Sequence, residues 1–116
     1  MGKIEVLLQE INENSEAVTF QKVIEAIDEN YIFTPTGFKN GYTYNEPNQN
    51  NGSCKVFSFA QIHNLSALET LHLFGDYYRV DVLKFPENED HQNIRNFIKF
   101  GWDGIRFDGE ALVEKA

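Results

Sequence analysis

Apolar residues recur at the spacing of helix faces along most of this chain. Near its start, four of them stand at positions i, i+3, i+4 and i+7: Ile4, Leu7, Leu8 and Ile11. That spacing predicts an amphipathic helix, which ends in the polar segment 12–16. A second stripe follows Thr19, a residue that can cap a helix, and it consists of Phe20, Val23, Ile24, Ile27 and Tyr31. Thr34-Pro35 then ends helical structure, because the residue before a proline avoids the α region.

The middle of the chain predicts a central helix followed by a capped one. The central helix runs from about Ser53 to His63 and has apolar residues on two faces, as a helix packed on both sides does. Ser66 and Glu69 have the spacing of a capping box. The helix that they open is predicted to close at Gly75, because glycine favours the residue just beyond a helix end.

Two more helices are predicted before the last glycine-rich segment. Asp76 can cap a short helix over 77–85, which a proline ends. Asp90 or Asn88 can cap the last strong helix, which ends at Gly101.

Only one segment predicts β-structure. Asn40-Gly41 stands between aromatic-rich arms, and Asn-Gly suits a type I′ turn with positive φ at both central residues. We therefore expect a short hairpin over Phe38–Tyr42, whereas segment 102–109 is expected to be an irregular arm. The predicted fold class is mainly α, at the margin of α+β: a compact bundle of about six short helices with one short β-hairpin, in a single domain over residues 1–116.

Composition and charge narrow the classes of function. The chain has 116 residues and a net charge of −8, and no basic stripe offsets its acidic segments, so nucleic-acid binding is not expected. No apolar run approaches the roughly 18–20 residues that span a bilayer, so no membrane segment is expected. A single cysteine excludes an internal disulfide and fits a reducing compartment, which predicts a cytosolic protein.

The one cysteine, Cys54, is a candidate nucleophile. If Ser53 or Asn51 caps the central helix, the thiol lies in the first turn, where the helix dipole favours the thiolate. Phe57 and Phe59 in the same helix favour burial, which raises the pKa of a thiol. Burial can shift a pKa by up to ~3–5 units, whereas an exposed helix end contributes only ~0.3–1 kcal/mol. We therefore expect burial to dominate and Cys54 to react slowly in the folded protein.

His91 is the candidate base. A Cys54–His91 couple, with Asp90 or an asparagine of segment 48–51 orienting the ring, would be the constellation of a thiol hydrolase. In the alternative interpretation, Asp90 and His91 cap the last helix and begin a surface charge ladder that continues with Arg95. The three histidines and one cysteine match no compact ligand pattern, so the sequence predicts neither a metal nor a cofactor.

Tyr77-Tyr78-Arg79 is a candidate contact patch. Tyrosine and arginine dominate binding hot spots, so Tyr77 and Arg79 are candidate binding residues, with Arg95 as a third. The alternative is that Tyr78 and Val82 are only the core face of a short helix.

Five segments of uncommon sequence follow one another along nearly the whole chain. They are Phe33-Thr34-Pro35-Thr36-Gly37-Phe38, Asn51-Gly52-Ser53-Cys54-Lys55, Leu73–Arg79 with Asp81-Val82-Leu83, Asp90–Phe97, and Gly101-Trp102-Asp103-Gly104-Ile105. In this order they resemble the HopJ type III effector family of small bacterial proteins. The resemblance implies one compact bacterial domain in the bacterial cytoplasm, with secretion into a host cell by a type III system as a further possibility. It implies no established reaction and no catalytic residues.

Three functions follow from these observations. The first is an effector-like or cytosolic bacterial protein, non-enzymatic or of unassigned activity, which acts through contacts with a host or bacterial protein. The second is a small thiol-dependent hydrolase that uses Cys54 with His91, and the third is a small-ligand-binding module. A concave pocket with Cys54 and His91 in hydrogen-bond reach would favour the hydrolase, and a flat patch with Tyr77 and Arg79 would favour the contact protein.

Overall fold

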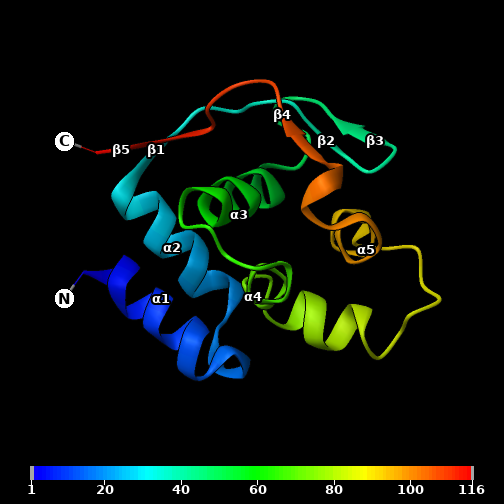
Figure 1. Cartoon of the computed structure of the whole chain (residues 1–116), viewed down its shortest axis with the longest axis horizontal. Coiled ribbons are helices and arrows are strands. Elements are labelled where there is room, and N and C mark those ends of the chain that lie inside the picture. Colours follow the sequence, from blue (N-terminus) through cyan, green and yellow to red (C-terminus); the bar gives the residue numbers. More distant parts are fainter. Residues whose placement is uncertain (1, 116) are drawn as a thin grey trace.

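The helices and strands of this protein are all short, and the computed structural model describes them over residues 2–115 (Figure 1). The α-helices are α1 (Lys3–Glu13), α2 (Phe20–Asn30), α3 (Asn51–Ile62), α4 (Ala67–His72) and α5 (Gln92–Phe100). A π-helical segment, η2 (Tyr77–Val82), follows α4, and the 3₁₀ turns are η1 (Ser15–Ala17) and η3 (Gly101–Gly104). The strands are β1 (Tyr31–Phe33), β2 (Phe38–Asn40), β3 (Thr43–Asn45), β4 (Ile105–Phe107) and β5 (Leu112–Glu114). The prediction of a mainly α fold is confirmed, with small sheets added to the helices.

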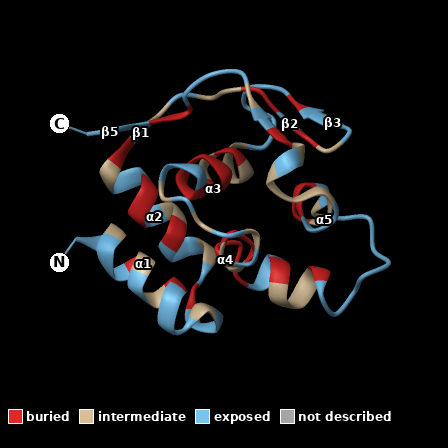
Figure 2. Ribbon diagram, viewed as in Figure 1, coloured by how far each residue is buried: buried red, intermediate tan, exposed pale blue. Residues whose placement is uncertain are grey.

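Helix α3 lies at the centre of the molecule, and its middle part is buried (Figure 2). Its buried residues are Cys54, Val56, Phe57, Ser58, Phe59 and Ala60. Helices α2 and α4 and strand β5 pack around it. The Phe57 ring contacts four other aromatic rings, those of Phe38, Phe74, Phe97 and Trp102. The prediction of a central helix with two apolar faces is therefore confirmed.

Two of the predicted helix caps are present. Lys22 N–H donates to Thr19 Oγ1 at 3.3 Å, which caps α2. Glu69 N–H donates to Ser66 Oγ at 3.1 Å, and Ser66 N–H donates to Glu69 Oε1 at 2.9 Å, which completes the capping box of α4.

Helix α3 begins without a side-chain cap, so the prediction of Ser53 or Asn51 as its cap was wrong. The N-cap is Asn50, whose side-chain amide instead donates to Asn45 Oδ1 at 2.6 Å. Cys54 N–H donates to Asn50 O at 3.0 Å. Cys54 thus lies one residue beyond the free N–H groups of the first turn.

Helix α5 also begins without a side-chain cap, and the prediction of Asp90 or Asn88 as its cap was wrong. Its N-cap is His91, while the Asp90 carboxylate is bound by Arg95 at 2.7 Å. Asp76, which precedes η2, makes no capping hydrogen bond either.

The predicted hairpin exists, but its turn lies one residue later than expected. Asn40 pairs with Thr43, so the two turn residues are Gly41 and Tyr42. Gly41 has a φ of +64°, whereas Tyr42 does not have a positive φ, so the type I′ prediction was wrong. The reason is that Asn40 is a fully buried strand residue whose side chain is bound inside the protein.

The remaining strands were not predicted. Strand β4 pairs with β2 to give the sheet order β3-β2-β4, and β1 pairs with β5, all antiparallel. Segment 102–109 therefore contains a strand and is not wholly irregular. Tyr31 begins β1 rather than ending the preceding helix, and its ring packs edge-on against Phe59. Both sheets lie on the same side of α3, at the top of Figure 1.

Candidate functional site

The candidate site is a pocket of about 400 Å³ between the starts of α3, α5 and η2. Its apolar wall is formed by Phe20, Phe74, Tyr77 and Ile94. Its polar wall is formed by Thr43, Asn45, Gln49, Asn50, Ser53, His91, Gln92 and Asn93, with Gly52 beside them. A concave surface that combines aromatic side chains with a few convergent polar groups is typical of a binding site.

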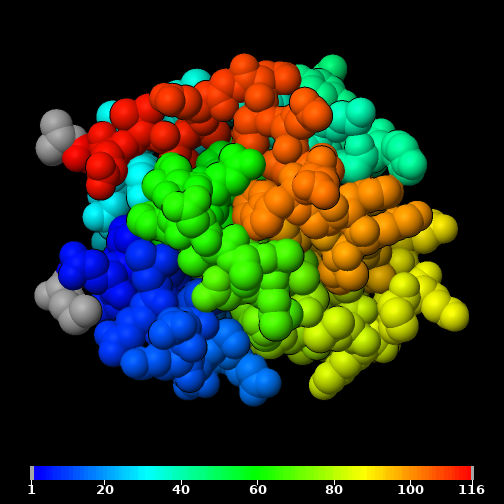
Figure 3. All heavy atoms as spheres, viewed as in Figure 1, coloured from blue at the N-terminus to red at the C-terminus, as the bar shows by residue number. Residues whose placement is uncertain are grey.

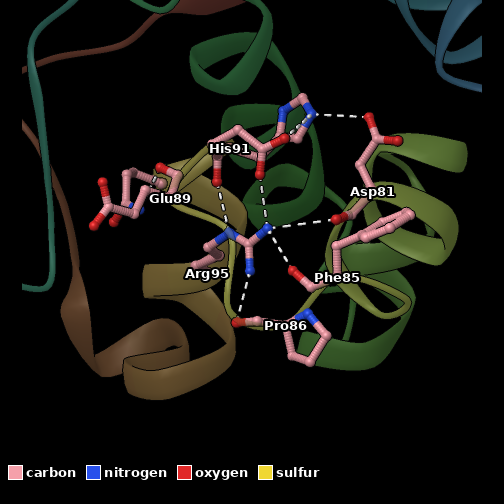
Figure 4. A network of polar contacts seen from close by, with 8 residues as sticks. Asp81, Phe85, Pro86, Glu89, His91 and Arg95 are labelled. Carbon is pink, nitrogen blue, oxygen red and sulfur yellow. Dashed lines mark hydrogen bonds and ion pairs between the residues drawn. The ribbon is translucent and has the colours of Figure 1, made fainter.

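His91 stands at the edge of this pocket in an unusual backbone conformation. Its φ of 51° and ψ of 48° are left-handed, a region that residues other than glycine seldom adopt. The ring Nε2 lies 3.0 Å from Asp81 Oδ2 and 3.8 Å from Asp90 Oδ2 (Figure 4). The Tyr77 ring leans against the imidazole, with the centroids 5.1 Å apart. Tyr77 and Asp81 lie four residues apart on η2, so this one segment fixes the imidazole from two sides.

The π-helical form of η2 follows from its hydrogen bonds. Leu83 N–H donates to Tyr78 O, five residues back, at 3.0 Å. Tyr78 and Val82 are buried, which confirms that they form the core face of the segment. The exposed side carries Tyr77, whose side chain also packs edge-on against Phe20 at 5.1 Å. Single turns of π-helix often occur at functional sites.

Arg79 points away from the pocket. Its guanidinium donates to Ser15 O at 3.1 Å, to His72 O at 3.3 Å and to Val18 O, and it lies 3.1 Å from His72 Nδ1. These contacts join the η1 region to α4. The structure therefore places this candidate binding residue in an internal joint.

Arg95 is also engaged by the protein itself (Figure 4). Its guanidinium donates to the carbonyl oxygens of Asp90 at 2.6 Å, Pro86 and Phe85 at 3.1 Å, and Asp81 at 3.4 Å. It also forms an ion pair with the Asp90 carboxylate at 2.7 Å. Instead of a charge ladder along the helix, Arg95 holds the segment that precedes α5.

Cys54 is turned into the core. The residue is 2 % exposed, and Sγ donates to Thr36 O at 3.4 Å. Burial raises the pKa of the Cys54 thiol. Cys54 does not line the pocket, and within residues 2–115 no hydrogen bond joins it to His91. The structure does not bring the two members of the candidate thiol-hydrolase couple together.

The sequence did not reveal a set of hydrogen-bonded amides at the polar wall. We call it the asparagine cluster, and it consists of the buried residues Asn40, Asn45 and Asn93 and the exposed residue Asn50. Asn40 Nδ2 donates to Asn93 O at 2.9 Å and to Asn93 Oδ1 at 3.0 Å. Asn93 and Asn45 exchange hydrogen bonds of 3.0 and 3.1 Å, and Asn50 donates to Asn45. The cluster ties β2 and β3 to the starts of α3 and α5. A separate signal for it is absent from the sequence, because each asparagine stands in a turn or helix-start context.

The other two histidines lie away from the pocket. His63 Nε2 is 2.8 Å from the Tyr31 hydroxyl, and burial lowers the pKa of His63. Burial, and then the charge of Arg79, lower the pKa of His72. Over the described residues, no group of three His, Cys, Asp or Glu side chains is arranged to hold a metal ion. None of the helices described has the length and apolar content needed to cross a membrane.

Comparison with known proteins finds one matching family model and a similar solved structure. Residues 4–112 match the family model described as HopJ type III effector protein. The crystal structure of VPA0580, described as a protein of unknown function, is 47% identical, with a TM-score of 0.94. The match covers 96% of this chain and 92% of that chain. A search of curated proteins finds no match.

Proposed function

We propose, on the premise that this chain belongs to the HopJ type III effector protein family, that it acts by non-covalent contact with a protein partner. The resemblance of its five sequence segments to that family is confirmed by the match. The contact surface in this proposal is the rim of the pocket around Tyr77 and His91. Because the family is described as type III effectors, the partner is sought both in bacterial cells and in host cells.

The flat patch with Tyr77 and Arg79 expected of a contact protein is not found, because Arg79 lies in an internal joint and Tyr77 lines a pocket. One observation still carries the proposal: an exposed tyrosine stands on a concave surface of mixed polarity. Tyr77 is 40 % exposed, yet its ring is held between Phe20 and His91, with centroid distances of 5.1 Å to each. A rigid aromatic side chain loses little conformational entropy on binding, which is why tyrosine is common in binding hot spots. The net charge of −8 supports a protein rather than a nucleic-acid partner.

The test is site-specific photocrosslinking. A photoreactive phenylalanine analogue placed at position 77 should capture a discrete protein from host or bacterial extract. Excess unlabelled protein should compete for that product, whereas a Tyr77→Ala variant should compete at least about tenfold less well. Leu68, which is 59 % exposed on α4, gives the matched control position. The same products from positions 77 and 68, or no product from either extract, would contradict the proposal.

A small-ligand-binding module is the second candidate, and the pocket volume favours it. A volume of about 400 Å³ falls within the range of sites for small molecules, about 300–1,000 Å³. A compound bound in the pocket should raise the melting temperature of the native protein and not that of Tyr77→Ala. The thiol hydrolase receives no support from the geometry, since Cys54 is buried and bound to Thr36.

A further inference from the structure

The pocket beside Tyr77 lies where segments that are far apart in the sequence meet. Figure 3 shows the β2–β3 hairpin, in blue-green, next to the region of α5, in orange, and β2 and α5 are in contact. The pocket also takes residues from α2, from the start of α3 and from η2. Its polar and aromatic walls differ in chemistry, so together they define the kind of ligand that fits between them.

Three amide side chains of the polar wall are held at one end and free at the other. Gln49 Oε1 accepts from Glu46 N–H at 2.9 Å, which leaves the Gln49 Nε2 donors free. Asn50 and Gln92 are bound through their nitrogens, to Asn45 Oδ1 and to a loop carbonyl group, both at 2.6 Å, which leaves their oxygens free. Among residues 2–115 these three side chains make no other hydrogen bond. A side chain that is already fixed at one end loses little entropy when a ligand binds the other end.

Hydroxyl and backbone groups complete the polar wall. Thr43 Oγ1 accepts from Asn96 Nδ2 at 3.3 Å, which leaves the threonine hydroxyl hydrogen to donate, and Ser53 adds a second hydroxyl. Helices α3 and α5 begin at this wall without side-chain caps, so their first backbone N–H groups are further donors. The wall therefore presents donors and acceptors close together, which suits a hydroxyl group, since a hydroxyl both donates and accepts.

The walls carry almost no charge. Within the part of the chain that the structure describes, none of the residues lining the pocket is Asp, Glu, Lys or Arg. The one imidazole, that of His91, is already engaged through Nε2 by Asp81 at 3.0 Å (Figure 4). A charged ligand would lose water without gaining a counter-ion, and a purely apolar ligand would leave the free amide ends unpaired. Both costs favour a ligand that is neutral and rich in hydrogen-bonding groups.

The aromatic wall is bent. The rings of Phe20 and Phe74 are nearly parallel, at 15°, whereas the Tyr77 ring meets Phe20 at 66°. A flat heterocycle stacks on only one of these planes, whereas a puckered ring places C–H groups against both. The faces of aromatic rings are negatively polarised and attract the positive edges of C–H bonds. The wall therefore favours a saturated ring.

We infer that the pocket binds a neutral sugar ring. The C–H groups of the sugar lie against Phe20 and Tyr77. Its hydroxyl groups bind the free ends of Gln49, Asn50 and Gln92. This inference rests on the second candidate function, ligand binding, because it names the ligand class for that pocket. A free sugar and a sugar carried by a partner protein present the same chemistry, and the experiment distinguishes these two sources.

The probes are the methyl glycosides of glucose, galactose, mannose and N-acetylglucosamine, each titrated into the ¹⁵N-labelled protein and followed by NMR. We expect at least one to bind with a dissociation constant of about 1–10 mM, shifting the amide signals of residues 49–53 and 92–94. Tyr77→Ala should weaken binding at least about tenfold. Gln49→Glu keeps the acceptor for Glu46 N–H and removes the free donor, so it should weaken binding about fivefold.

Matched controls separate binding in the pocket from general effects of the substitutions. Tyr42→Ala removes a tyrosine that is 87 % exposed and lies outside the pocket. Gln61→Glu makes the same change of charge as Gln49→Glu, at an exposed position near the end of α3. Both variants should bind the glycoside as the native protein does. Tetrahydropyran, a saturated ring without hydroxyl groups, should not bind, because it leaves the amides of the polar wall unpaired.

Four results would overturn the inference: no binding of any glycoside, equal binding of tetrahydropyran, an equal loss of affinity in the control variants, or tighter binding of inorganic phosphate or adenosine at the same residues. If no glycoside binds, but another compound raises the melting temperature of the native protein and not that of Tyr77→Ala, the sugar ring is refuted and the ligand-binding function stands.

The photocrosslink at position 77 identifies the source of the sugar. If excess methyl glycoside abolishes the crosslinked product, the partner protein carries the sugar. If the glycoside binds and the crosslinked product is unchanged, the ligand is a free sugar. Both results support the pocket as a sugar site, and crosslinking without any glycoside binding leaves only the protein contact.

Discussion

The reactivity of Cys54 is the most direct test of whether this protein can perform thiol chemistry. Iodoacetamide must reach the sulfur and must meet it as a thiolate. The 2 % exposure of Cys54 blocks access, and burial opposes ionisation by raising the pKa of the thiol. The hydrogen bond from Sγ to Thr36 O further holds the sulfur in place. Labelling therefore requires the start of α3 to open.

The size of the expected protection follows from where α3 lies. It is the central helix, and its N-cap Asn50 belongs to the asparagine cluster, so opening its start disturbs both the core and the sheet contacts. Global unfolding of a domain costs about 5–15 kcal/mol, and an opening that involves the core lies near the upper part of the local range. An opening cost of about 4 kcal/mol slows labelling by about 10³, since each 1.4 kcal/mol is a factor of ten.

The assay is alkylation at pH 7 followed by mass spectrometry, with the native protein compared with the urea-unfolded chain. We expect native Cys54 to react at least about 10³ times more slowly. Leu68→Cys provides an exposed thiol on α4 that should react fast in the folded protein. Native labelling within about tenfold of the unfolded rate, with an ionisation below pH 7, would refute this reasoning and favour the thiol hydrolase.

Three further predictions concern the stability of the fold. Burial lowers the pKa of His63, so the folded protein keeps the ring neutral and loses stability as the pH falls below about 6.5. His63→Gln should therefore flatten the decline of the urea midpoint between pH 7 and 5, and an unchanged slope would contradict this. Gly75 has a φ of +61°, and an added Cβ would lie 2.8 Å from the Phe20 backbone nitrogen. Gly75→Ala should therefore lower the free energy of unfolding by about 1–3 kcal/mol in urea titrations. A variant as stable as the native protein would show that the backbone shifts freely there. Ser66→Ala removes the capping box of α4 and should cost about 1 kcal/mol in the same titration, whereas Ser66→Asp should retain most of the stability; equal losses in both would exclude the capping bond as the cause.

The helices could be predicted because their signals are local. The apolar stripe of α1 and the caps Thr19 and Ser66 each lie within a few residues of the structure that they specify. Strand β4 has no such signal. It is three residues long, and it pairs with β2, which lies more than sixty residues earlier in the chain. Periodicity cannot identify so short a strand, and nothing local identifies its partner.

The pocket could not be predicted either, because its residues come from segments that are distant in the sequence. Asp90 was the obvious partner for His91 because it is adjacent in sequence, yet the shorter contact is made by Asp81 from η2. His91 also has a left-handed backbone conformation, for which the sequence carries no signal. Tyr77 was a candidate from its chemistry alone, and the structure places it on the pocket wall. Arg79 and Arg95 had the same kind of chemistry, but their guanidinium groups bind backbone carbonyls.

The burial of Asn40 has a consequence for the chemical ageing of this protein. In an Asn-Gly pair, the asparagine deamidates when the glycine nitrogen attacks the side-chain carbonyl carbon. Here Gly41 N–H is held by Gly104 O at 2.9 Å, and the Asn40 amide is held by Asn93, so the folded chain opposes that attack. In an unfolded chain the reaction is free to proceed, and it would leave a carboxylate facing two oxygen acceptors of Asn93 in a fully buried site. The product would not refold to the same structure, so the amount of deamidation at position 40 reflects how long the chain has been unfolded.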